Sequence, residues 1–249
     1  MMAPDGRSPA EAEAPAPAAR PDPATLLGQC QRLLENTYGA RSGVDFGDFV
    51  VGADRCRQLS ERVSGEHQSE YGDGGRFFYY LSGGDLRMAI FYTDELIARL
   101  EAHDPRRGLG EANVLQFVVF LEEISHALHT SLTFRENRRR LMRPSFPAEL
   151  EVQAKIDVFL ALVFFLQRLE GSERLSPAAR RWIEANLFDR WATAYASPDL
   201  ARRYAVAVQM GRQAIAYLDS VPSPARLAAV RRLRSLSLRG KRRLLEGHA

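Results

Sequence analysis

The sequence predicts an α+β protein in which a small sheet containing a β-hairpin is followed by a predominantly α-helical body. Two runs rich in aromatic and apolar residues, 76–81 and 86–92, flank the turn sequence Ser-Gly-Gly-Asp, which is typical of a hairpin. From residue 111 onward, long segments carry apolar residues at helical spacing. The sequence contains no internal repeat, so we expect a globular fold and not a solenoid.

The elements before residue 111 are predicted from short local signals. Residues 24–38 place leucines and Cys30 at helical spacing, which predicts an amphipathic first helix. Residues 47–54 contain a short strand candidate, and the glycine-rich polar interval 64–75 separates it from the hairpin. After the hairpin, Thr93 is a candidate N-cap for a short helix that ends near residue 104.

The helical body is expected to contain several long helices and a basic end. The predicted helical segments are 111–132, 147–170, 176–196 and 197–221. The last two begin with Ser-Pro, a favourable N-cap and first-turn pair. Residues 135–143, Arg-Glu-Asn-Arg-Arg-Arg-Leu-Met-Arg, are expected to form a polar loop that turns the chain back.

Composition sets further limits on the class of protein. Residues 1–23 are rich in Ala, Pro and Glu and lack the apolar stretch of a signal peptide, so we expect a disordered leader. The most apolar segment, 158–166, is far shorter than a transmembrane helix. Cys30 and Cys56 form no CxxC pair and are too few for a disulfide framework, which favours a reducing compartment and a cytoplasmic location. No Walker loop, dinucleotide fingerprint or nucleophile elbow is present.

The candidate functional residues lie in the segment 117–132. Its sequence is Phe-Val-Val-Phe-Leu-Glu-Glu-Ile-Ser-His-Ala-Leu-His-Thr-Ser-Leu. On a helix, Glu122, His126 and His129 lie on one face with apolar residues, and Glu123 lies at the edge of that face. The segment is apolar nearly all round and should be buried. A buried carboxylate costs several kcal/mol unless it is neutralised, paired or bound to a metal. We therefore expect a positive partner for this cluster.

The sequence Glu-Glu-Ile-Ser-His resembles the zinc-binding motif HExxH of zincin metallopeptidases. Glu122 stands where the first histidine of that motif belongs, Glu123 stands at the general-base position, and His126 matches the second histidine. The resemblance is to the compact zincins that cleave phage repressors or act in bacterial radiation response. It implies a zincin-like core, and it departs from the family at Glu122, because carboxylate replaces imidazole there.

A second helix supports the same resemblance. In these zincins a downstream helix carries Glu-x-x-Ala followed by Phe, and Glu151, Ala154 and Phe159 form a similar pattern with a later Phe. The resemblance implies a divalent metal, zinc first, held by Glu122, His126 and Glu151. It implies hydrolysis of a peptide or protein substrate, with Glu123 as the general base on a metal-polarised water. It covers about residues 24–170, and the domains expected are thus the leader 1–23, a zincin-like core and a helical extension, 171–249.

Other interpretations of these residues remain open. The acidic and imidazole groups also fit a buried network of hydrogen bonds and ion pairs without metal. His129 fits a packed or supporting histidine, and Glu149 competes with Glu151 as the third ligand. Glu123 and His126 also form the Glu-x-x-His unit of di-iron proteins, but the helical segments contain no second such unit.

The basic C-terminal end allows a second function class. The segment after residue 222 intersperses leucines with basic residues and predicts an amphipathic helix with a cationic face. These basic residues are Arg226, Arg231, Arg232, Arg234, Arg239, Lys241, Arg242 and Arg243. Such a face is either solvated or binds an acidic partner, nucleic acid or an anionic membrane. The alternative function is therefore a non-catalytic interaction or regulatory protein that keeps the zincin-like scaffold.

Overall fold

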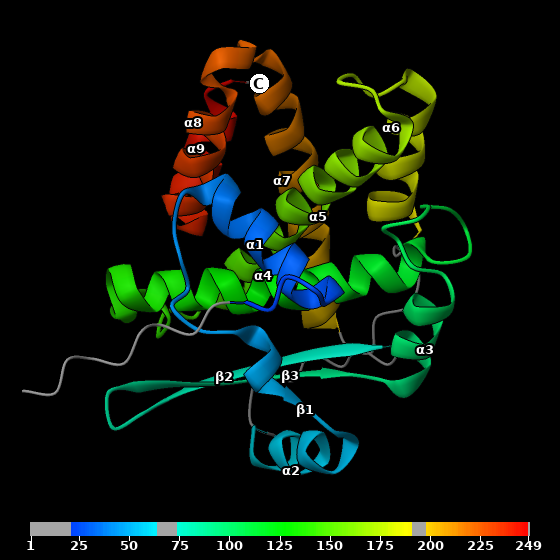
Figure 1. Cartoon of the computed structure of the whole chain (residues 1–249). Helices are drawn as coiled ribbons and strands as arrows, with labels where there is room; N and C mark the ends of the chain where they lie inside the picture. Colours follow the sequence, from blue (N-terminus) through cyan, green and yellow to red (C-terminus); the bar gives the residue numbers. More distant parts are fainter. Residues whose placement is uncertain (1–20, 64–73, 191–197, 249) are drawn as a thin grey trace, which may run out of the picture.

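The computed structural model describes residues 21–63, 74–190 and 198–248, and in these ranges the chain is α+β (Figure 1). The first half contains α1 (Leu26–Tyr38), η1 (Phe46–Phe49), β1 (Val50–Val51), α2 (Ala53–Val63), β2 (Gly75–Ser82), β3 (Asp85–Tyr92) and α3 (Asp94–Ala102). The second half contains α4 (Val114–Asn137), η2 (Arg138–Arg140), α5 (Phe146–Glu170), α6 (Pro177–Glu184), η3 (Ala185–Asp189), α7 (Pro198–Ser220), α8 (Ser223–Ser235) and α9 (Leu238–Glu246).

The described sheet has the strand order β1-β3-β2. Strands β2 and β3 form the predicted hairpin, antiparallel from Gly75 opposite Tyr92 to Ser82 opposite Asp85. Its turn consists of Gly83 and Gly84, whose φ values of 61° and 94° lie in the left-handed region that glycine adopts without a side-chain clash. Strand β1 pairs in parallel with β3, so β2 is an edge of this sheet.

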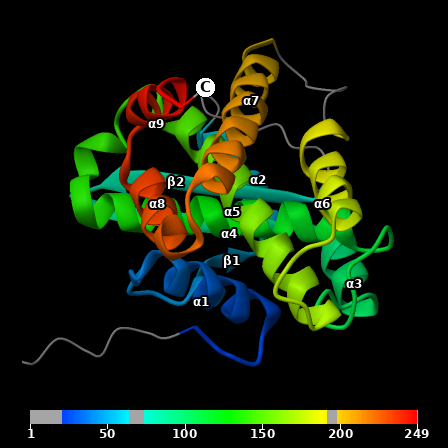
Figure 2. The ribbon, with the colours of Figure 1, turned by 90° about the horizontal axis from the view of Figure 1, so that it is seen from above.

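Helices cover the sheet mainly on one side. Figure 1 shows α4 lying along one face of the sheet and the short helix α2 on the opposite face. Helix α5 crosses α4 obliquely, and α1, α7, α8 and α9 lie on the far side of α4 from the sheet (Figures 1 and 2). Helices α4 and α5 are therefore the central layer that the other elements bury.

The burial of α4 and α5 follows from their sequences. Both helices are apolar nearly all round, and nearly all of α4 from Phe117 to Thr133 is buried. A helix of this kind is stable in water only when other elements surround it. At two helix N-termini, backbone N–H groups are capped by neighbouring side chains. The Thr25 and Thr93 hydroxyls accept hydrogen bonds from the first turns of α1 and α3.

Several boundaries differ from those predicted. The strand expected in 47–54 is reduced to two residues, and α2, which we did not predict, follows it. The loop expected at 135–143 is partly helical, because α4 continues to Asn137 and η2 follows. The single basic helix expected at the end is divided into α8 and α9, since Ser237 caps a new helix through its hydroxyl.

Other predictions about the chain stay predictions. The leader and most of the polar interval, 64–73, lie outside the described residues, as does the end of the segment predicted at 176–196. One hydrophobic core includes side chains from α1 in the predicted zincin-like core and from α9 in the predicted extension, for example Cys30 and Leu245. Within the described ranges, no helix combines the length and apolar character that crossing a bilayer requires.

Candidate functional site

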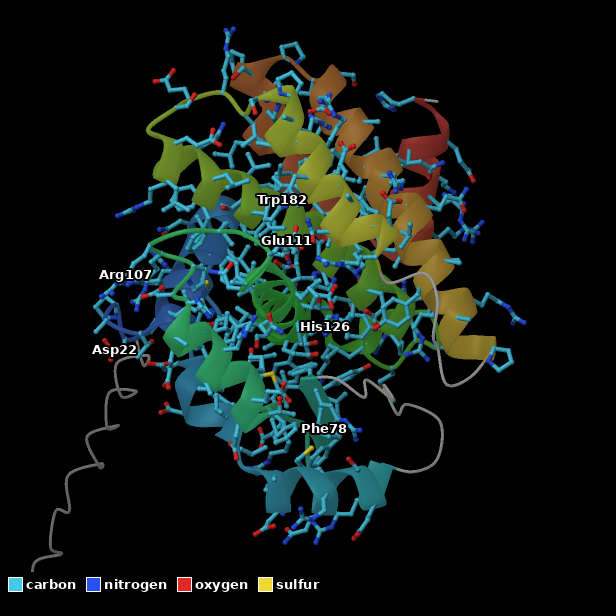
Figure 3. All side chains as sticks on the ribbon, turned by 90° about the vertical axis from the view of Figure 1, so that its right-hand side faces the viewer. Asp22, Phe78, Arg107, Glu111, His126 and Trp182 are labelled. Carbon is cyan, nitrogen blue, oxygen red and sulfur yellow. The ribbon has the colours of Figure 1, made fainter. Side chains whose placement is uncertain are left out.

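The acidic and imidazole side chains of α4 and α5 lie in the interior of the protein. Glu122, Glu123, His126 and Glu151 are each at most 6% exposed. Figure 3 shows His126 inside the molecule, on the side of the sheet that bears the central helices, while the labelled Phe78 lies further toward α2. Helices α4 and α5 bring their carboxylates together because the two helices pack directly against each other.

His126 lies between two carboxylates. Its Nδ1 atom is 3.3 Å from Oε2 of Glu123, one turn earlier on α4, and its Nε2 atom is 3.5 Å from Oε2 of Glu151 on α5. The first contact is a long hydrogen bond, whereas the second is an ion-pair distance at the limit of hydrogen bonding. The structure therefore brings together three of the four predicted site residues around one imidazole ring.

The fourth residue, Glu122, has a different partner. Nζ of Lys155 donates to Oε1 of Glu122 at 2.6 Å, and both residues are at most 5% exposed. Lys155 lies one helical turn after Glu151 on α5 and thus faces the same side of that helix. Sequence reasoning missed Lys155, although its position four residues after Glu151 in an otherwise apolar helix was a usable signal.

Burial and charge set the protonation of the histidine. Burial disfavours the charged imidazolium of His126, but the carboxylates of Glu151 and Glu123 outweigh it and raise the pKa of His126 to about 10. Burial raises the pKa of Glu123, opposed by its hydrogen bond with His126. The cluster therefore contains two cations of its own, the Lys155 ammonium and the His126 imidazolium.

These donors do not fit a zinc ion in the observed arrangement. Zinc needs ligand atoms that converge to about 2.0–2.2 Å from one point, and it needs a deprotonated imidazole nitrogen. Oε1 of Glu122 is held by Lys155, and both ring nitrogens of His126 face carboxylates. No group of three or more His, Cys, Asp and Glu side chains in the described ranges is arranged to hold a metal ion. The assignment of zinc to Glu122, His126 and Glu151 stays a prediction that the observed arrangement does not favour.

The edge strand β2 covers the cluster. Gly75 at its start packs so closely on α4 that an added Cβ atom would lie 2.9 Å from Cγ of Glu123 and 2.9 Å from Cγ1 of Val119. The ring centroid of Phe77 is 6.3 Å from that of His126. Close packing by a glycine and an aromatic ring leaves the cluster shielded from water, which strengthens its ion pairs.

A second buried cluster involves His129 and Glu149. Nε2 of His129 donates to Oε1 of Glu149 at 2.9 Å, and Nη2 of Arg140 lies 2.6 Å from the same oxygen. Oε2 of Glu149 accepts from the backbone N–H of Leu238 at 2.9 Å. Burial lowers the pKa of His129 to about 3, so the ring is neutral. Burial opposes the charge of Glu149, but its hydrogen bonds outweigh burial and lower its pKa to about 2. Glu149 thus joins α5 to α4, η2 and α9.

A third buried carboxylate, Asp157, is satisfied by hydrogen bonds from three elements. The hydroxyl of Tyr38 on α1 and Nε2 of Gln153 on α5 donate to Oδ1, the latter at 2.9 Å. The hydroxyl of Ser125 on α4 donates to Oδ2 at 2.6 Å. Burial raises the pKa of Asp157, and these hydrogen bonds oppose the shift. Tyr38, Ser125 and Gln153 had no role in the sequence prediction.

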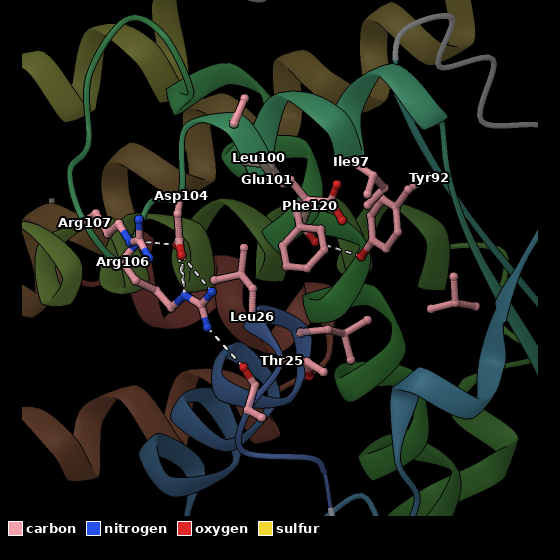
Figure 4. A pocket seen from close by; sticks show the side chains of 14 residues that line it. Thr25, Leu26, Tyr92, Ile97, Leu100, Glu101, Asp104, Arg106, Arg107 and Phe120 are labelled. Atoms are coloured by element: carbon pink, nitrogen blue, oxygen red, sulfur yellow. Dashed lines mark hydrogen bonds and ion pairs between the residues drawn. The ribbon is translucent and has the colours of Figure 1, made fainter.

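Three cavities in the described part of the chain are lined by residues other than those of the His126 cluster. One of about 600 Å³ lies between α1, α3 and α4, and its apolar wall includes Leu100 and Phe120 (Figure 4). The Tyr92 hydroxyl, also in this wall, donates to the backbone oxygen of Phe120 at 3.0 Å. Two others, of about 740 and 410 Å³, are lined by other residues. None of the three is lined by a predicted catalytic or metal-binding residue.

Comparison of the chain with protein-family models, with curated proteins and with solved structures finds no match.

Proposed function

We propose that this chain is a non-catalytic interaction or regulatory protein with a zincin-like scaffold, in which Lys155 supplies the positive charge that a metal ion supplies in active zincins. The observation that carries this proposal is the buried contact of 2.6 Å between Nζ of Lys155 and Oε1 of Glu122. A buried carboxylate needs one compensating cation, and an ammonium already at hydrogen-bonding distance fills that need.

The scaffold part of the proposal rests on the order of elements and on the motif positions. A helix, a small sheet with a hairpin and a short helix precede α4, which carries Glu-Glu-Ile-Ser-His, and α5 follows with Glu151. Helix α4 packs against the hairpin, and α5 packs against α4. This order agrees with the resemblance to compact zincins and supports a common scaffold.

The interaction part rests on a basic surface formed by η2, the turn after it, α8 and α9. The exposed arginines of this surface whose guanidinium groups form no ion pair or hydrogen bond within the described ranges are Arg139, Arg143, Arg232, Arg239, Arg242 and Arg243. Arg140 joins the two parts of the surface, because its guanidinium donates to the backbone oxygens of Ser235 and Leu236. Uncompensated guanidinium groups favour an acidic protein partner through charge-assisted hydrogen bonds.

Metal analysis of the purified full chain tests the first part. After incubation with zinc and dialysis, we expect no stoichiometric metal in the wild-type protein. Glu122→Ala and His126→Ala are the controls, because both residues belong to the predicted ligand set. One zinc ion per chain that disappears in both variants would contradict the proposal.

Binding of a fluorescent polyglutamate peptide tests the second part. We expect binding that weakens with salt and is lost when Arg239, Arg242 and Arg243 are changed together to Glu. A matched variant changes Arg55, Arg57 and Arg62 to Glu, which are all exposed on α2 on the opposite side of the sheet. Equal loss in the two variants would show that binding reflects only total charge.

A metal-dependent peptidase is the second candidate function. Its supporting observation is that Glu123, His126 and Glu151 meet at one buried point on α4 and α5. Peptide hydrolysis that requires added zinc and is abolished in Glu123→Gln would establish this candidate in place of the first.

A further inference from the structure

A groove of about 740 Å³ runs between α1 and the C-terminal half of α5. Four arginines line it: Arg32 and Arg41 from α1 and the loop after it, Arg106 from the segment after α3, and Arg168 from α5. No Asp or Glu of the described residues is part of its lining. The groove, called the arginine groove below, therefore has a positive lining and belongs neither to the His126 cluster nor to the basic surface of α8 and α9.

Two of the four arginines are already paired. Nη1 of Arg41 lies 3.0 Å from Oε2 of the buried Glu35. Nε of Arg106 donates to both carboxylate oxygens of Asp104 at 2.9 Å, a contact visible in Figure 4. These two guanidinium groups are held in place by neighbouring carboxylates and contribute little net charge to a ligand.

The other two have no such partner. Arg32 is half-buried and Arg168 is exposed, and neither guanidinium group forms an ion pair or a hydrogen bond with any residue in the described ranges. A half-buried guanidinium gives up part of its hydration, so a compensating anion stabilises it. Guanidinium groups bind phosphate oxygens through two parallel hydrogen bonds, which makes phosphate a good match for Arg32 and Arg168.

The groove also has an exposed apolar part beside its arginines. Phe164 is 41% exposed and Leu169 is 36% exposed, and both lie on α5 near Arg168. An aromatic ring left open to solvent offers a face on which a planar heterocycle stacks. Cationic and aromatic groups in one groove match a ligand that joins an anion to a flat ring.

We propose that the arginine groove binds a nucleoside phosphate. Its phosphates are placed at Arg32 and Arg168, and its base is placed on Phe164. The volume agrees with this choice, since ligand sites of about 300–1,000 Å³ accommodate ligands of this size. The site is independent of the proposed function, because it shares no residue with the His126 cluster or with the basic surface.

Isothermal titration calorimetry of the full chain with ATP at low ionic strength tests this proposal. We expect saturable binding at one site per chain. Arg32→Gln and Arg168→Gln should each weaken the Kd about tenfold or more, as expected for the loss of charge-assisted hydrogen bonds. The matched control is Arg181→Gln, an exposed arginine on α6 outside the groove, which should leave the Kd unchanged.

The contributions of the base and the phosphates are distinguished by one further ligand, tripolyphosphate, and one further variant, Phe164→Ser. Phe164→Ser should weaken ATP binding by about fivefold or more and leave tripolyphosphate binding unchanged, because only ATP has a base to stack. Circular dichroism confirms that each variant is folded. The absence of saturable ATP binding, or equal affinities of wild-type protein, Arg32→Gln and Arg168→Gln, overturns the proposal.

Two other results also overturn it in favour of a different ligand. Tripolyphosphate that binds as tightly as ATP, together with no effect of Phe164→Ser, identifies a general anion site. A single-stranded oligonucleotide that binds far more tightly than ATP, and loses affinity in Arg168→Gln, identifies a site for a nucleic-acid strand.

Discussion

Replacing Lys155 by Met should destabilise the protein strongly, and replacing Glu122 by Gln at the same time should recover most of the loss. Methionine is unbranched and only one atom shorter than lysine, and it removes the charge. In Lys155→Met, the Glu122 carboxylate loses its contact at 2.6 Å and stays in a site where both residues are nearly solvent-free. Leaving one charge of a buried pair uncompensated costs about 3–5 kcal/mol.

Urea unfolding followed by circular dichroism measures the free energy of unfolding of each variant, and thermal unfolding measures its Tm. For a domain of this size, such a loss lowers the Tm by about 6–20 °C. The variants Glu122→Gln, Lys155→Met and the double variant form a thermodynamic cycle, and the expected coupling free energy is about 2 kcal/mol or more. The double variant should be near the wild type in stability, since an apolar or neutral pair of similar volume replaces a buried ion pair at little cost.

One outcome would refute this reasoning directly. If Lys155→Met and Glu122→Gln each change the free energy of unfolding by less than about 1 kcal/mol and their effects are additive, the two side chains do not form a buried pair in solution. Lys155 would then not be the cation that compensates Glu122, and the non-catalytic interpretation would lose its main support.

Three further predictions concern the surroundings of the cluster. Gly75→Ala should lower the free energy of unfolding by about 1–3 kcal/mol, because the new methyl group meets Glu123 and Val119. The control is Gly108→Ala, where no atom lies within 4 Å of an added Cβ, and it should be nearly neutral in thermal unfolding. Burial lowers the pKa of Lys241 from 10.5 to about 7, so between these pH values folding releases a proton that the unfolded chain binds, and stability decreases as the pH falls from 10.5 to 7. The stability of Lys241→Met relative to the wild type should therefore rise by up to about 1.4 kcal/mol for each unit that the pH falls within that range, and a difference independent of pH would contradict this prediction. Tyr38→Phe removes a hydrogen bond to the buried carboxylate of Asp157 and should cost about 1.5–3 kcal/mol in urea unfolding, and an unchanged midpoint would contradict this role.

The fold class was predictable because its signals are local. The hairpin follows from two aromatic runs around a pair of glycines, and α4 and α5 follow from their length and apolar content. Helix α2 was missed because Ala53–Val63 contains few apolar residues and follows a glycine, which resembles a polar connection. The division of the basic end was missed because its hydrophobic pattern continues across the break at Leu236.

The candidate site was predictable only in part, because contacts between α4 and α5 depend on how the two helices cross. Helical spacing placed Glu123 beside His126, which is a contact within one helix. The resemblance implied that His126 and Glu151 ligate one metal ion, and the structure places Nε2 of His126 3.5 Å from Oε2 of Glu151. The partner of Glu122 could not be read from spacing, since Lys155 lies 33 residues away and reaches Glu122 only through tertiary packing.

Buried polar groups also explain how helices as uniformly apolar as α4 and α5 take one arrangement. An all-apolar helix surface offers many packing orientations of similar free energy, because hydrophobic contacts have no direction. Hydrogen bonds to a buried carboxylate require defined distances and angles. Asp157 meets α1 and α4, and Glu149 meets α4 and α9, so rotation of α5 would leave both carboxylates unpaired.

The same argument separates a structural role of the His126 cluster from a catalytic one. If the cluster serves mainly to fix α4 against α5, then Glu122→Gln with Lys155→Met should keep stability but broaden the range of helix orientations, as seen by loss of near-UV circular dichroism. Binding of polyglutamate should then weaken as well, because the arginines of α9 are positioned through Glu149 at the start of α5. Retained near-UV circular dichroism and unchanged peptide binding in this double variant would show that the apolar contacts alone determine the arrangement.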